Sequence, residues 1–154
     1  MSVVSDTTAI TTLLKAGQTQ LLQDLYQRVL VPQAVWDELT VFHQQLPDFI
    51  NLHRVHDASL RLPGTELLGR GEAEAILLAQ ELNAQLLLTD DRKARLAAQR
   101  LHIPCLGLVG MIVYAKRLGR IASVHALLTL LETKGGLYLS EAVTEEALRL
   151  ANEI

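Results

Sequence analysis

Acidic side chains stand at four separated places in the 154-residue chain, each near the end of a predicted strand or on a predicted helix. Carboxylates are the oxygen ligands that hard cations such as Mg²⁺ or Mn²⁺ prefer in proteins. A cation held by several carboxylates can activate water and stabilise an in-line displacement at phosphorus. No short segment presents enough oxygens for one ion, so the acids must gather from distant parts of the chain. The candidates are Asp6, Glu38, Glu72, Asp90 and Asp91.

Asp6 directly follows a short run of small and β-branched residues, 2–5, which we interpret as a buried strand. Thr7 or Thr8 can cap a helix beginning near Ala9, because a threonine oxygen accepts from the free amides of the first turn. In an open parallel sheet, ligands bind just beyond the carboxyl ends of the strands, where Asp6 would stand. The alternative is that Asp6 is only a turn or capping residue.

Glu38 lies within a helix expected over 33–44, opened by a proline. Val35, Leu39 and Phe42 recur on one face of this helix, which predicts that they are buried, and Glu38 lies on the same face. Burying a charged carboxylate costs several kcal/mol unless something compensates, on the order of its lost hydration. Glu38 is therefore either at an edge, with its head in water, or in a shared polar cavity.

Glu72 lies at the start of a strong helix that we expect from about 69 to 83. An acid in the first helical turn also suits the helix dipole, and this is the alternative explanation for both Glu72 and Glu74. Each of the two aligns with apolar residues. Periodicity alone therefore does not decide which glutamate faces inward.

Asp90 and Asp91 end the clearest strand in the chain, 84–91, which contains three consecutive leucines. A helix over 92–101 follows, with apolar residues at helical spacing. A second strand thus ends in acids where a helix begins, as the first one does. The pattern does not decide which of the two aspartates is the main acid.

Strands alternating with helices predict an α/β fold, a three-layer α/β/α sandwich with a short central parallel sheet. We expect one domain over 1–154, in which residues from about 121 to 154 form a helical C-terminal extension. The predicted strands are 2–5, 28–31, 84–91 and 103–106. Further helices are expected at 18–26, 107–118, 121–133 and 141–152.

The composition narrows the class of protein. A single cysteine, Cys105, excludes an internal disulfide and a cysteine zinc site. The net charge of −3 argues against non-specific wrapping of nucleic acid, which needs many cationic contacts, but it is compatible with a nuclease. With no span of about 18 apolar residues and no secretory signal pattern, we expect a cytoplasmic protein without membrane association.

Four segments together resemble the PIN-domain family: VVSDTTAI, VPQAVWDEL, GRGEAEAI and LLLTDDRKAR. They occur in the family's order and in the expected strand and helix context, over roughly residues 2–120. The ending, through GGLYLSEAVTEEALRLA, is similar to a prokaryotic subgroup with a helical tail. The resemblance therefore covers most of the chain.

The resemblance implies a Mg²⁺- or Mn²⁺-dependent ribonuclease, often the toxin of a toxin–antitoxin pair and commonly a homodimer. By motif, the family's acids correspond to Asp6, Glu38, Glu72 and Asp91, with Asp90 as an assisting neighbour. The third acid is more usually aspartate in this family, so the longer Glu72 is a departure that bears on metal geometry.

Two functions follow from the sequence. The first is a metal-dependent endoribonuclease acting on RNA, with an antitoxin protein as partner. The second is a catalytically weak PIN-like module that binds RNA or a partner protein. Acids at all four positions favour the first, and failure to bind Mn²⁺ would favour the second.

Overall fold

A five-stranded, wholly parallel sheet forms the centre of the computed structural model, which describes residues 2–154. The strand order is β3-β2-β1-β4-β5. Every strand is only two or three residues long. The strands are β1 (Val3–Ser5), β2 (Val29–Val31), β3 (Ile50–Leu52), β4 (Leu86–Leu88) and β5 (Cys105–Leu106).

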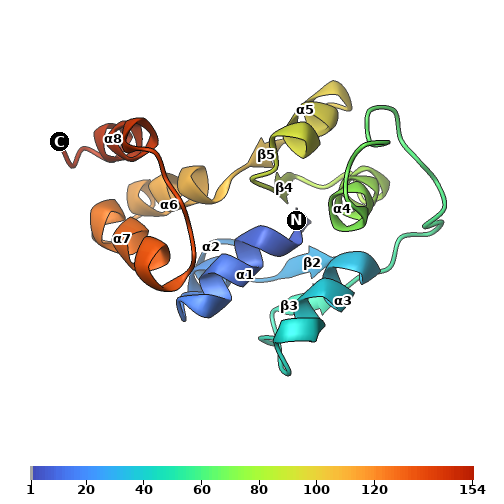
Figure 1. Ribbon diagram of the computed structural model, residues 1–154, viewed down its shortest axis with the longest axis horizontal. Helices are drawn as coiled ribbons and strands as arrows, with labels where there is room; N and C mark the ends of the chain where they lie inside the picture. The colour runs from blue at the N-terminus through green and yellow to red at the C-terminus, as the bar shows by residue number, and fades with distance from the viewer. Residues whose placement is uncertain (1) are drawn as a thin grey trace.

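Helices connect the strands and follow the last one (Figure 1). The first three are α1 (Thr7–Lys15), α2 (Gln20–Tyr26) and α3 (Gln33–Phe42). They are followed by α4 (Arg70–Glu81), α5 (Arg92–Arg100), α6 (Leu108–Arg117), α7 (Val124–Lys134) and α8 (Glu141–Leu150).

Alternation along the short strands divides the core into two layers. Val3 and Val4, neighbours in β1, belong to different apolar clusters, as side chains of successive strand residues must. One cluster joins the sheet to α1, α2, α3, α6, α7 and α8, and the other joins it to α4 and α5. The predicted three-layer α/β sandwich is therefore confirmed. Both sheet faces are covered, which explains why the strands are almost wholly apolar.

The strand order places a topological switch point between β1 and β4. From β1 the chain builds outward through β2 and β3, and then returns to add β4 and β5 on the other side. Ser5 is in register with Leu88, so the two strands end at the same level. Ligands of open α/β sheets bind in the crevice outside such a point. Asp6 and the pair Asp90–Asp91 follow these two strand ends.

The last three helices pack together at one end of the molecule, where α7 and α8 both contact α6 and α7 also contacts α1 (Figure 1). Gly135 allows this approach, because a Cβ there would lie 2.9 Å from Thr12 O of α1. Across residues 2–154, no helix has the length and apolar character to cross a membrane.

Three sequence predictions differ from the structure. The chain forms a fifth strand, β3, where the sequence shows no clear pattern. Helix α1 begins at Thr7, so Asp6 rather than a threonine occupies the position before its first turn. Phe42 is 83% exposed instead of buried, because α3 ends there and extends past the core that covers Val35 and Leu39.

Candidate active site

Asp6 is the most deeply buried acid at the switch point and is only 2% exposed. Its backbone amide donates to Leu88 O at 3.0 Å, which extends the β1–β4 ladder by one residue. Thr89 Oγ1 donates to Asp6 Oδ2 at 2.6 Å. Asp6 Oδ1 is buried and has no hydrogen-bond partner within residues 2–154. Such atoms are rare because they are costly, so this oxygen is available to a ligand.

The ionisation of Asp6 reports which acids surround it. Burial raises the pKa of Asp6 from 3.8 to about 6. The hydrogen bond from the Thr89 side chain lowers this pKa, and so does the backbone amide of Ala9. The negative charges of Asp90 and Glu72 raise it. Like charges raise the pKa of a carboxyl group only when they are near. Asp90 and Glu72 are therefore electrostatic neighbours of Asp6.

Asp90 lies between the end of β4 and the start of α6. Its Oδ1 atom accepts a hydrogen bond from Leu108 N, at the first residue of α6, at 3.0 Å. Burial raises the pKa of Asp90, while the Leu108 amide and the Arg95 guanidinium lower it. Asp90 is thus held at the same end of the sheet as Asp6.

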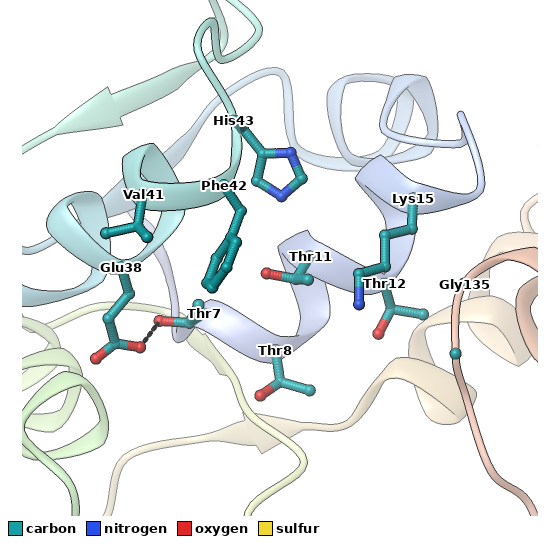
Figure 2. A pocket seen from close by; sticks show the side chains of 11 residues that line it. Thr7, Thr8, Thr11, Thr12, Lys15, Glu38, Val41, Phe42, His43 and Gly135 are labelled. Atoms are coloured by element: carbon teal, nitrogen blue, oxygen red, sulfur yellow. Dashed lines mark hydrogen bonds between the residues drawn. The ribbon is translucent and has the colours of Figure 1, made fainter.

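Glu38 reaches the site from α3 and is exposed to solvent. Thr7 Oγ1, in the first turn of α1, donates to Glu38 Oε2 at 2.6 Å (Figure 2). Because Thr7 follows Asp6 directly, this bond ties Glu38 to the end of β1. Of the two explanations given for Glu38, the edge position with its head in water is the one observed.

Glu72 and Glu74 have different roles although both begin α4. Glu74 is 3% exposed and accepts hydrogen bonds from Ala34 N at 3.1 Å and Arg70 Nε at 3.2 Å. It therefore fixes the start of α3 against α4. Glu72 is partly exposed and is the glutamate whose charge acts on Asp6. Glu74 is therefore the glutamate that faces inward, while Glu72 is only partly buried.

Asp91 is engaged in a helix cap. Its Oδ1 atom accepts from Ala94 N at 2.8 Å, at the first turn of α5. Thr89 Oγ1 accepts from Asp91 N at 3.3 Å, so one hydroxyl contacts both Asp6 and the backbone of Asp91. A metal-ligand role for Asp91 stays a prediction.

Three of the acids lie against glycines. A Cβ at Gly71 would come within 2.6 Å of Glu38 Oε1, and one at Gly107 within 2.5 Å of Asp90 Oδ1. A Cβ at Gly69 would similarly come within 2.6 Å of a Glu72 oxygen. Any larger residue at these positions would displace a carboxylate from its present place.

Sequence reasoning missed the residues that position the acids. Thr7 was expected to cap a helix, and Thr89 had no assigned role. The available signal was that each threonine is next to an acid at a strand end. The glycine contacts carried no such signal, because Gly71 meets Glu38 only after α3 packs on α4.

The donor set fits a hard divalent cation in chemistry, since all candidates are carboxylates and Asp6 Oδ1 lacks a partner. In their present positions, however, no three such side chains among residues 2–154 are grouped closely enough to hold one ion. Glu38 and Glu72 have flexible side chains and are at least partly exposed.

Comparison with models of known protein families assigns the chain to a family. A family model described as PIN domain matches residues 2–153. The chain belongs to the PIN-domain family. This confirms the resemblance seen in the four sequence segments. PIN domains are generally nucleases, so the chain has a nuclease-type fold.

A solved structure agrees with this assignment at the level of the fold. The PIN domain described here is similar to a PilT N-terminus domain protein from the archaeon Sulfolobus solfataricus, with a TM-score of 0.55 and 19% sequence identity. The similarity covers 72% of this chain and 90% of the archaeal one. No curated protein matches the chain.

Proposed function

We propose that this PIN domain is a divalent-metal-dependent endoribonuclease that hydrolyses phosphodiester bonds of RNA, using Mg²⁺ or Mn²⁺. The observation that carries the proposal is the buried, unpartnered Oδ1 of Asp6 at the switch point, with Glu72 and Asp90 as electrostatic neighbours. A buried carboxylate with two further acids near it is costly, because burial removes its hydration and like charges repel, so such an arrangement is uncommon without a binding or catalytic role. A perturbed pKa in such a place is typical of functional sites.

We assign the roles of metal ligand to Asp6, Glu72 and Asp90. A divalent cation held by them would supply positive charge beside the phosphate and lower the pKa of a water molecule. Thr89 and the Leu108 amide would orient Asp6 and Asp90 respectively. Such outer hydrogen bonds fix the direction of metal ligands. Asp90 is favoured over Asp91 as the fourth acid, because its charge acts on Asp6 while Asp91 caps α5.

We assign to Glu38 the acceptance of a proton from the attacking water. Its exposure and its bond to Thr7 support this role, since a general base must reach water while keeping a fixed position. In the cell, we propose that the enzyme is a toxin held inactive by an antitoxin protein, and that it works as a homodimer. The family resemblance supports both of these statements.

Cleavage of a labelled single-stranded RNA pool tests the proposed activity. Wild type should cut with Mn²⁺ and not with EDTA, and Glu38→Gln should lose most of this activity. Asp37→Asn is the matched control, because Asp37 is the adjacent exposed acid on α3 and its side chain accepts a hydrogen bond from Gln33 Nε2 of the same helix. Metal-independent cutting, or equal cutting by Glu38→Gln and wild type, would contradict the proposal.

A further inference from the structure

A groove of about 670 Å³ runs beside α1 and shares Glu38 with the candidate active site (Figure 2). Its floor is one side of α1, and its walls are the end of α3 and the loop after α7. The acids described above use only the Glu38 end of this groove. The remaining length therefore has no role in the proposed chemistry.

Hydroxyl groups and one cation line the floor of the groove. Thr8, Thr11 and Lys15 follow each other at i, i+3 and i+7, which places them on one side of α1. The seven-residue step from Thr8 to Lys15 corresponds to about 10 Å along the helix. Threonine hydroxyls and lysine are side chains that contact phosphate and sugar in nucleic-acid complexes. They supply polar contacts in a groove whose lining is otherwise largely apolar and carries little net charge.

Phe42 forms the facing wall and is 83% exposed, although its position in the helical pattern predicts a buried residue. Figure 2 shows its ring beside Thr7 and Thr11. An exposed aromatic ring beside hydroxyl groups provides a surface on which an unpaired base can stack. Phe42 thus adds an aromatic contact to the groove.

We propose that this groove holds a segment of single-stranded RNA and leads it to the acids, with a base on Phe42 and the backbone along Thr8, Thr11 and Lys15. The proposal rests on the proposed nuclease function. A nucleic-acid strand is the occupant favoured by continuity, because the groove opens onto Glu38. Threonine hydroxyls both donate and accept, as the ribose 2′-hydroxyl does, which favours RNA over DNA.

Fluorescence anisotropy with a labelled 12-nucleotide oligouridine tests the proposal, in EDTA so that binding is measured without cleavage. Phe42→Ala should weaken binding by about 5- to 150-fold, the effect expected for losing one stacked base. Lys15→Ala should reduce the slope of log K against log salt by about 0.7, as loss of one phosphate contact requires. Both residues are exposed, so neither change should unfold the chain.

Tyr114→Ala and Lys93→Ala are the matched controls, since they remove an aromatic ring and an exposed cation that do not line the groove. Both should bind as wild type does. Binding of Phe42→Ala equal to wild type, or competition by oligodeoxyuridine equal to that of oligouridine, would overturn the proposal. Asp6→Asn separates the two hypotheses, because it should retain RNA binding in EDTA while losing Mn²⁺-dependent cleavage.

Discussion

Asp6 is the buried carboxyl group of the candidate site. Its ionisation should make the free energy of unfolding of the metal-free protein depend on pH. Its pKa is raised from 3.8 to about 6 in the folded state. Between these values the folded chain binds more protons than the unfolded chain, so stability falls as pH rises from about 4 to 6. The size of this loss is on the order of 3 kcal/mol.

The first prediction compares wild type with Asp6→Asn in EDTA. The asparagine has nearly the same shape but no charge, so it should escape this loss. The mutant should match wild type near pH 4 and be more stable, by up to about 3 kcal/mol, above pH 6. Urea denaturation across this range measures the difference, and parallel stability curves would exclude Asp6 as the titrating group.

Some of the acids in the candidate site could be chosen from the sequence, and one choice could not be made from the sequence pattern. Asp6, Glu38 and Glu72 could be chosen as candidates from the sequence because each lies at a strand end, on a helix stripe or in a helix start. The strand pattern could not separate Asp90 from Asp91, since both follow the same strand, and only the family resemblance favoured Asp91. Our preference for Asp90 uses a contact that the sequence does not show: Leu108 N, 18 residues away in sequence, donates to Asp90 Oδ1.

Among the helices, α3 packs on α4 so that the Glu38 carboxylate lies in the space left by the missing side chain of Gly71. Gly71→Ala should push the Glu38 carboxylate aside without breaking the fold, because the obstructing atom is the end of a flexible side chain. Mn²⁺-dependent cleavage should therefore fall by about 100-fold, the lower end of what a positioned general base contributes.

Gly110→Ala on α6 is the control for this second prediction. Its new Cβ would also meet the end of a side chain, Leu106 Cδ1 at 2.7 Å, but no acid. Alanine is more favourable than glycine in a helix, by roughly 1 kcal/mol in the interior, so both changes should favour their helices to a similar degree. Comparable loss of cleavage in the two variants would show that general repacking, rather than displacement of Glu38, is responsible.

Elements with a strong pattern were predictable, and those decided by pairing were not. The strand of three leucines and the helix after it, α5, follow from composition and 3.6-residue spacing. Strand β3 has three residues at the edge of the sheet and exists because it pairs with β2. Phe42 obeys the helical period of α3, but the sequence does not say where the core beneath that helix ends.

At the scale of the whole molecule, Glu153 joins the end of the chain to α6 and α7. Its carboxylate accepts from Lys116 Nζ at 2.8 Å, Val124 N at 2.6 Å and His125 N at 3.0 Å. The hydrogen bond from Lys116 is the largest cause that lowers the pKa of Glu153, to about 2. The stabilisation is therefore present above pH 4.5 and is lost as pH falls toward 2.

Glu153→Gln should lower the free energy of unfolding by about 1.5–3 kcal/mol at pH 7, the range for a hydrogen bond to a charged group. The difference from wild type should shrink below pH 4.5. Glu145→Gln, which removes an exposed acid on α8, should change stability by less than about 0.5 kcal/mol. Equal effects of the two substitutions in urea melts would show that the hydrogen bonds of Glu153 to α6 and α7 do not stabilise the fold.

We propose that Asp6 and its neighbouring acids bind a divalent cation. Thermal melts with EDTA and with Mn²⁺ test this binding. Wild type should gain stability by mass action, about 2.7 kcal/mol at a hundredfold excess of Mn²⁺ over its dissociation constant. Asp6→Asn should lose most of that gain, although it is at least as stable as wild type in EDTA. An equal Mn²⁺ shift in both proteins, or none in either, would contradict the claim.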